Sequence, residues 1–262
     1  MTTLLNQFNS TIYGPVNSWR VGKSLGVDLL FTNSICSFRC IYCQLGKINE
    51  HTATRKIFVP TERVIADLLA SQWQEADVIT FSGNGEPTLA LNLGEVMGEI
   101  KAITNKPVVV LTNSTLLHDS AVRSELAAAD KIFCKLDAAT DHTLKLIDRP
   151  VAGITVQTIV AGIKSLRQEY QGHLAIQTML MPLNQHEVEA LADLLKDIQP
   201  DEVQLNLPSR PVPREWSIES RGNHSRSEEN AVKLKSLSAE DYKLIGERLQ
   251  QLTRLHFTLA SR

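Results

Sequence analysis

Three of the four cysteines in this 262-residue chain lie within eight positions of one another. Cys36, Cys40 and Cys43 follow the spacing Cys-x3-Cys-x2-Cys, and Cys134 lies far from them in the sequence. Thiolates are soft ligands that suit zinc or the iron of iron–sulfur clusters. A structural zinc site normally has four protein ligands, whereas three thiolates on a short loop can bind three irons of a [4Fe–4S] cluster and leave the fourth iron open. The spacing therefore favours an iron–sulfur cluster.

An aromatic residue, Tyr42, directly precedes the third cysteine. This arrangement after an apolar run resembles the signature of the radical S-adenosylmethionine (radical SAM) superfamily. The resemblance implies that Cys36, Cys40 and Cys43 ligate one [4Fe–4S] cluster and that Tyr42 belongs to the cofactor site. It also implies that S-adenosylmethionine binds the open iron, that the reduced cluster breaks its S–C5′ bond, and that a 5′-deoxyadenosyl radical abstracts hydrogen from a substrate. The alternative is a zinc site completed by Cys134 or a histidine.

Two glycines and a glutamate follow the second apolar run, in the sequence Ser82-Gly83-Asn84-Gly85-Glu86. Glycine lets the backbone approach a ligand closely, and a carboxylate accepts hydrogen bonds from an ammonium group. The segment resembles the glycine–glutamate motif of the superfamily, which implies that Gly83, Gly85 and Glu86 hold the methionyl amino group. Because Asn-Gly is also a turn signal, the alternative is a simple turn between a strand and a helix.

The next two apolar runs end in Asn113 and Asp137. Asn113 is a candidate partner for a ribose hydroxyl or the carboxylate of S-adenosylmethionine, and the alternative is a helix N-cap. Strand alternation places Lys135 and Asp137 on one side and Cys134 on the other. Asp137 therefore either binds ribose or substrate or caps the next segment, and Cys134 is interpreted as a buried apolar cysteine. The sequence singles out no catalytic hydrogen donor.

Weaker candidates lie within or near the last two apolar runs. Polar side chains inside parallel strands need partners, so Gln177, Gln204 and Asn206 are candidates to line a cavity. Arg149 and Arg210 either bind an anionic group or lie on the surface as ordinary exposed arginines.

Apolar runs that are mostly rich in β-branched residues alternate with amphipathic stretches along the chain. Such runs are typical of buried parallel strands, and an apolar spacing near 3.6 residues is typical of helices. The predicted strands cover 26–32, 78–82, 108–112, 131–137, 174–181 and 202–207. The predicted helices cover 61–71, 93–103, 121–129, 156–170, 187–198 and 239–252.

This alternation predicts a parallel α/β fold, either an open sheet or a barrel, with function at the carboxyl ends of the strands. The resemblance to the superfamily implies a partial (β/α)6 barrel of the TIM-like type, open on one side. We expect an N-terminal segment at 1–25, the barrel at 26–209, and a C-terminal loop with a capping helix at 210–262. The prolines and polar residues after Arg210 indicate a loop or lid.

The composition sets limits on partners and location. A formal charge of −2 gives no global reason to expect nucleic-acid binding. No run of eighteen apolar residues and no secretory signal is present, so we expect a cytoplasmic protein without a membrane span. A small-molecule or peptide substrate is favoured over tRNA, and the resemblance implies a flavodoxin- or ferredoxin-like electron donor.

The N-terminal sequence Tyr13-Gly14-Pro15 and the residues after it are similar to a radical SAM subgroup related to wyosine-tRNA synthases. The chain lacks the second cysteine set that those synthases use for an additional cluster. Three alternatives remain beside a single-cluster radical SAM enzyme: an activase that places a glycyl radical on a partner protein, a wyosine-type tRNA-modifying enzyme, and a non-enzymatic, zinc-stabilised binding module.

Overall fold

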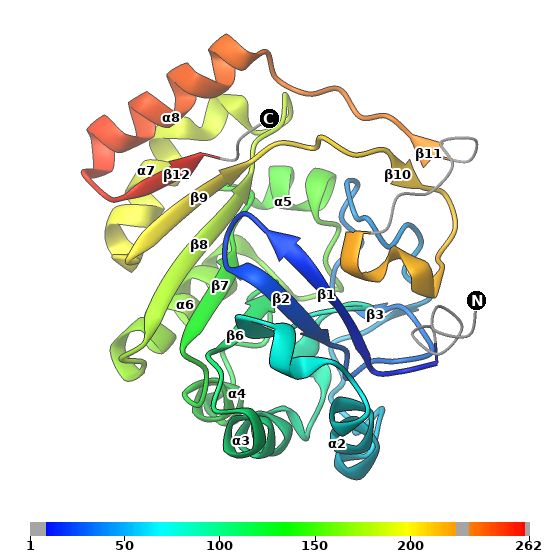
Figure 1. Ribbon diagram of the computed structural model, residues 1–262. Helices are drawn as coiled ribbons and strands as arrows, with labels where there is room; N and C mark the ends of the chain where they lie inside the picture. Colours follow the sequence, from blue (N-terminus) through cyan, green and yellow to red (C-terminus); the bar gives the residue numbers. More distant parts are fainter. Residues whose placement is uncertain (1–8, 224–230, 260–262) are drawn as a thin grey trace.

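The computed structural model describes residues 9–223 and 231–259, and its centre is one sheet of eight strands in the order β1-β2-β5-β6-β7-β8-β9-β12. The strands from β2 to β12 run parallel, and β1 pairs antiparallel with β2. The sheet curls, and the helices cover its outer side (Figure 1). The strands are β1 (Ile12–Ser18), β2 (Gly22–Val27), β5 (Val78–Phe81), β6 (Val108–Thr112), β7 (Lys131–Lys135), β8 (His173–Met179), β9 (Glu202–Asn206) and β12 (Phe257–Leu259).

The helices alternate with these strands, as the periodicity predicts. They are α2 (Thr61–Leu69), α3 (Leu93–Thr104), α4 (Ser120–Leu126), α5 (Asp141–Ile147), α6 (Val156–Glu169), α7 (Val188–Ile198) and α8 (Ala239–Thr253). Two small two-stranded sheets lie outside the main one. They pair β3 (Ile35–Cys36) with β4 (Glu50–His51) and β10 (Val212–Pro213) with β11 (Ala231–Val232). No helix in the described part of the chain is long and apolar enough to cross a membrane.

The predicted mixed α/β fold with a mostly parallel sheet is confirmed, and all six predicted strands occur, β6 with the predicted ends and the other five with shifted ends. The largest shift is in β2, which begins at Gly22 and ends at Val27, so residues 28–32 form a turn instead of a strand. The Asp28 side chain stabilises this turn by accepting a hydrogen bond from the Leu30 amide at 3.0 Å. Periodicity did not indicate β1, β12 or α5, which are short or half-exposed.

The two faces of the curled sheet bury different residues. A large apolar cluster fills the space between the outer face and the helices, and it contains Cys134, which is fully buried. The interpretation of Cys134 as a buried apolar cysteine is therefore confirmed. A small cluster fills the inner face, made of Val78, Val109, Phe133 and Ala175. Because the inner cluster is small, the carboxyl ends of the strands above it are left open to a cavity.

The segment after β9 returns to the N-terminal hairpin of β1 and β2 (Figure 1). Arg221 forms an ion pair with Asp28 at 3.1 Å, and both side chains are almost fully buried. The Trp216 indole donates a hydrogen bond to Asn84 Oδ1 at 3.2 Å. The described part of the predicted loop or lid therefore packs against the barrel, and residues 224–230 of that prediction, like residues 1–8 of the N-terminal segment, lie outside the described residues.

Candidate functional site

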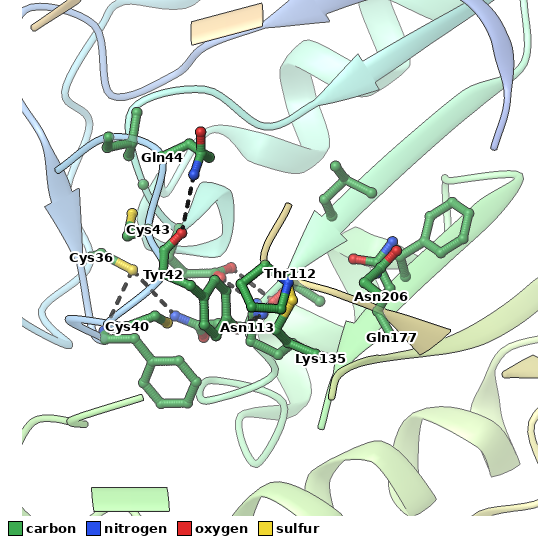
Figure 2. Close-up of a pocket in the computed structure, with 18 of the residues that line it drawn as sticks. Cys36, Cys40, Tyr42, Cys43, Gln44, Thr112, Asn113, Lys135, Gln177 and Asn206 are labelled. Carbon is green, nitrogen blue, oxygen red and sulfur yellow. Dashed lines mark hydrogen bonds between the residues drawn. The ribbon is translucent and has the colours of Figure 1, made fainter. Parts of the chain in front are cut away.

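A cavity of about 470 Å³ opens at the carboxyl ends of the parallel strands. Figure 2 shows the three cysteines on one side of this cavity and Gln177 and Asn206 on the other. Of the residues that the sequence predicts for the site, the cavity brings together Cys36, Cys40, Tyr42, Cys43, Gly85, Glu86 and Asn113. Gly83 lines a smaller neighbouring cavity instead, and Asp137 lies behind the wall.

The cysteine loop is fixed by backbone contacts at both ends. Cys36 ends β3, which pairs with β4. Farther along, the amides of Arg39 and Ile41 donate to the carbonyls of Asp148 and Ile147, at 2.8 and 2.9 Å. The loop therefore lies against the end of α5, an element far away in the sequence.

The three cysteines are unbonded thiols in an environment that disfavours thiolates. Burial, together with the negative charge of Glu86, raises the pKa of Cys36 to about 12. Burial also raises the pKa values of Cys40 and Cys43. Cys40 Sγ donates a hydrogen bond to Asp148 Oδ1 at 3.2 Å. A bound metal deprotonates such thiols outright, so these side chains suit metal binding better than nucleophilic catalysis.

The arrangement of the three cysteines also fits an iron–sulfur cluster. Within residues 9–223 and 231–259, no three or more His, Cys, Asp or Glu side chains are grouped as the ligands of a single metal ion would be. In a [4Fe–4S] cluster each thiolate binds a different iron, so the ligands do not have to meet at one point. Three thiols facing one cavity are therefore compatible with such a cluster.

Glu86 is buried at the edge of the cavity, and the ends of two strands orient it. Its Oε1 accepts hydrogen bonds from Thr88 and, at 2.8 Å, from the Thr112 hydroxyl. Its Oε2 accepts one from the backbone amide of Asn113 at 2.6 Å. Burial raises the pKa of this carboxyl, and the same hydrogen bonds lower it. Because Oε2 has a single donor from the chain, it has room for another from a ligand.

The two glycines before Glu86 let the loop pass close to other segments. Gly85 has a φ of +152°, and a Cβ atom there would overlap the carbonyl of Ile35, beside the first cysteine. Gly83 has a φ of +117° and lies against Asp28. The segment is therefore more than a simple turn between a strand and a helix. Its glycines bring the end of β5 into contact with the cysteine loop.

Asn113 connects β6 to the cysteine loop. Its Nδ2 donates to Ser37 Oγ at 2.8 Å and to Cys36 Sγ at 3.4 Å, and its Oδ1 accepts from Thr115. The alternative role as a helix N-cap is wrong, because Asp119 caps α4. Asn113 therefore orients the cysteine loop and also borders the cavity.

Tyr42, Lys135 and Asp137 form one buried group. The Tyr42 hydroxyl donates to Asp137 Oδ2, and Lys135 Nζ lies 4.6 Å from the centroid of the Tyr42 ring and donates to both partners. Burial and the charge of Asp137 raise the pKa of Tyr42. Asp137 does not cap α5, whose N-cap is Thr140, so that alternative is wrong. The group holds the aromatic residue and the lysine in the cavity wall.

The residues of the opposite cavity wall were only partly predicted from the sequence. Gln177, Asn206 and Arg210 line the cavity, whereas Gln204 and Arg149 do not. Sequence reasoning missed Trp19 and Arg20, which form the tip of the β1–β2 hairpin and also line the cavity. Arg20 belongs to the N-terminal sequence that resembles a radical SAM subgroup, but that resemblance assigned it no role in the site. The pairing of β1 with β2 places both residues at the cavity.

Comparison with protein families matches residues 30–195 to the radical SAM superfamily. A UPF0026 protein of Synechocystis is 49% identical over 222 residues, which cover 84% of each chain. A UPF0026 protein of Methanocaldococcus jannaschii is 30% identical over 206 residues, which cover 76% of this chain and 64% of the relative.

Solved structures with the same fold include SuiB of Streptococcus suis bound to the precursor peptide SuiA, with a TM-score of 0.62 and 14% identity over 87% of this chain. SuiB has also been solved with S-adenosylmethionine bound. The chain spans about half the length of SuiB, 47% of it. The match over 30–195 includes all three clustered cysteines and Glu86. This chain therefore belongs to the radical SAM superfamily, whose members are enzymes that use a [4Fe–4S] cluster and S-adenosylmethionine.

Proposed function

We propose that this enzyme binds a [4Fe–4S] cluster through Cys36, Cys40 and Cys43 and cleaves S-adenosylmethionine reductively to abstract hydrogen from a small-molecule or peptide substrate. The observation that carries this proposal is the convergence of three free thiols, Glu86 and Asn113 on one cavity. When bound, the reduced cluster supplies the electron that breaks the S–C5′ bond of S-adenosylmethionine. A flavodoxin- or ferredoxin-like protein would provide that electron.

The residues around the thiols then have distinct roles. Glu86 accepts a hydrogen bond from the methionyl ammonium group at Oε2, because its Oε1 already accepts hydrogen bonds from Thr88 and Thr112. Gly85 allows the Glu86 segment to lie against the cysteine loop. Asn113 donates a hydrogen bond to Cys36 Sγ, which stabilises negative charge on the sulfur.

The group of Tyr42, Lys135 and Asp137 also serves this site, because it orients Lys135 in the cavity wall. Lys135 is held by Tyr42 and Asp137, and it presents a positive charge to the cavity beside Cys40. Burial would lower the pKa of Lys135, but the negative charges of Asp137, Cys40 and Asp148 outweigh it and raise this pKa. The lysine therefore stays charged and stabilises thiolate at Cys40.

The test is made on the full chain purified without oxygen. Iron and sulfide content, the EPR spectrum after dithionite with and without S-adenosylmethionine, and 5′-deoxyadenosine release are measured. We expect about four irons per chain, an EPR signal altered by S-adenosylmethionine, and its cleavage. Colourless protein that carries one zinc and forms no cluster on reconstitution would overturn the proposal.

Single cysteine variants sharpen this test. Cys36→Ala, Cys40→Ala and Cys43→Ala should each lose the cluster and all cleavage. Cys134→Ala is the matched control, because Cys134 is also a free thiol but is buried on the helix side of the sheet. Retention of iron in any of the first three variants, or its loss in the control alone, would contradict the ligand assignment.

A further inference from the structure

Exposed basic side chains gather on the outer side of the cysteine loop, away from the cavity. Arg39 directly precedes Cys40 in this loop. Its amide donates a hydrogen bond to the carbonyl of Asp148 at 2.8 Å, which joins the loop to the end of α5. Lys145 lies in the last turn of α5, and Arg149 directly follows Asp148. The exposed basic residues of the loop and of the helix end are therefore neighbours.

The segment after β11 adds two lysines beside the same loop. Leu234 packs against the small apolar cluster that contains Tyr42 of the loop and Ile147 of α5. Lys233 and Lys235 flank Leu234, and both are exposed. This segment therefore brings two more positive charges to the outer side of the loop. We call the following five residues the basic surface: Arg39, Lys145, Arg149, Lys233 and Lys235.

The charges of the basic surface are not neutralised within the part of the chain that the structure describes. None of the five side chains forms an ion pair with a described carboxylate. The carboxylates nearby have other partners. Glu50 pairs with Lys56 at 2.9 Å, and the buried Asp148 side chain accepts a hydrogen bond from a cysteine thiol. Asp141, at the other end of α5, accepts one from a backbone amide.

The uneven distribution of charge indicates a negatively charged partner. The chain has a formal net charge of −2, yet five cations without a described carboxylate partner share one small surface. Such a patch attracts an acidic partner and orients it as it approaches. Leu146, which is 41% exposed, lies next to Lys145 and offers an apolar contact among the charges. Small interfaces of this kind are typical of transient electron-transfer complexes.

The basic surface also lies where an electron can reach the cysteines. In the proposed function, S-adenosylmethionine and the substrate occupy the cavity side of the thiols, so the electron donor approaches from the outer side. Arg39 is exposed on that side, and the adjacent residue Cys40 lines the cavity. Electron transfer slows steeply with distance, so a donor docked against Arg39 has a short path to the cavity.

We propose that the basic surface docks an acidic protein that donates one electron to the cluster. The donor loses one electron, the oxidised cluster gains it, and no proton or covalent bond is exchanged. The inference rests on the proposed function, because that function requires the electron. A nucleic acid fits less well, since a substrate bound on the outer side of the loop would not reach the cavity.

The test uses a purified acidic flavodoxin as the probe and the anaerobic full chain after cluster reconstitution. Calorimetry measures the binding of oxidised flavodoxin, and 5′-deoxyadenosine release with reduced flavodoxin measures electron delivery. We expect Lys145→Glu, Arg149→Glu and Lys235→Glu each to weaken binding roughly threefold to tenfold, as reversal of a charge at the edge of an interface predicts. Added salt should weaken binding to the unchanged chain. Release driven by excess dithionite, which needs no docking, should stay the same in all variants.

Arg254→Glu is the matched control. Arg254 is exposed and lies between α8 and β12, at the amino ends of the strands and therefore at the end of the sheet away from the cysteine loop. This variant should bind flavodoxin as the unchanged chain does. Iron content and urea unfolding check every variant, and the corresponding Gln variant replaces any Glu variant that loses iron or stability.

Four outcomes would overturn the inference. They are an equal loss of binding in Arg254→Glu, binding that salt does not weaken, no binding of flavodoxin to the unchanged chain, and tighter binding of bulk tRNA that is lost in the same three variants. The last outcome would assign the basic surface to a nucleic acid.

Binding and cleavage are measured separately, so that this inference and the proposed function can fail separately. Flavodoxin binding that depends on Lys145, Arg149 and Lys235, in a protein that holds no cluster and cleaves nothing with dithionite, would overturn the proposed function and leave the docking surface standing. Cleavage with dithionite, together with flavodoxin binding that none of the three variants weakens, would overturn the docking surface alone.

Discussion

Among the single residues of this site, Glu86 has two roles. Its carboxylate joins the ends of two strands through hydrogen bonds, and it also faces the cavity. Its hydrogen bonds come from Thr88, Thr112 and the Asn113 amide. Those donors position the side chain before any ligand arrives. A group oriented in this way loses little freedom when it binds, which strengthens its interaction with an ammonium group.

Glu86→Gln should keep the iron content and weaken S-adenosylmethionine binding roughly tenfold to a hundredfold. The variant removes a charge-assisted hydrogen bond, which contributes about 1.5–3 kcal/mol. Equilibrium dialysis of S-adenosylmethionine against the anaerobic protein measures the change. Glu75→Gln, at an exposed glutamate paired with Lys23, is the control and should bind normally. An unchanged affinity in Glu86→Gln would remove Glu86 from the ligand site.

At the scale of elements, the contact between the Gly85 loop and β3 sets the position of the cysteine loop. A side chain at Gly85 would overlap the Ile35 carbonyl, and the φ of +152° is one that other residues rarely adopt. This contact therefore links the end of β5 to the first cysteine.

Gly85→Ala should lose most of its iron and destabilise the fold by about 1–3 kcal/mol, because the backbone must shift to relieve the overlap. Gly98→Ala is the matched control, since nothing lies within 4 Å of a Cβ at this helical position. Ala favours the helix there, so the control should be stabilised by up to about 1 kcal/mol. Iron content and urea unfolding measure both effects, and a fully loaded Gly85→Ala protein would contradict the account.

A second element-scale feature is Glu202, which links β9 to two other strands of the sheet, β7 and β12. Glu202 accepts hydrogen bonds from Lys131 of β7, Gln204 of β9 and Thr258 of β12, each at 2.8 Å. Burial raises the pKa of Glu202, but these partners outweigh it and lower the pKa to about 2. The paired carboxylate therefore stabilises the folded state whenever it is ionised.

The free energy of unfolding should fall through this group as the pH decreases. The contribution is complete above the ordinary pKa of 4.5 and is lost as the pH falls from about 4.5 toward about 2. Its size is roughly 2 kcal/mol after allowance for solvent screening. In Glu202→Gln this component of the acid dependence should vanish. Urea unfolding of cluster-free protein between these pH values compares the two, and parallel curves would contradict the prediction.

At the scale of the whole molecule, the ion pair between Asp28 and Arg221 joins the first part of the chain to the last. Burial raises the pKa of Asp28, and the charge of Arg221 lowers it. The Asn84 side chain also donates to Asp28 Oδ2 at 2.6 Å, so the glycine loop belongs to the same network.

Arg221→Met should destabilise the fold by about 3–5 kcal/mol, because it leaves a carboxylate buried without its partner. The double variant Arg221→Met/Asp28→Asn should recover much of that loss. Arg248→Met breaks an exposed pair with Glu189 and should cost less than about 1 kcal/mol. Urea unfolding measures all three variants. An effect of Arg221→Met no larger than that of Arg248→Met would show that the buried pair contributes little.

The amino-acid sequence by itself determined the features that depend on residues close together in the chain. The spacing of Cys36, Cys40 and Cys43 indicated the metal chemistry, and the strand–helix alternation predicted the parallel α/β fold. The place of Gly85 and Glu86 beside the cavity could be predicted because the superfamily motif is contiguous. These signals depend on neighbours a few residues apart, where covalent geometry fixes which side chains share a loop, a strand face or a helix face.

Only the tertiary structure decided which distant residues meet. Tyr42 binds Asp137 across 95 positions, Trp216 reaches Asn84 across 132, and Arg221 reaches Asp28 across 193. Arg20, in the turn between β1 and β2, and Arg210, after β9, line one cavity although 190 positions separate them in the sequence. Such contacts depend on how strands pair and helices pack, which the pattern along the chain does not specify. The cysteine loop could therefore be predicted from sequence, and the wall opposite it could not.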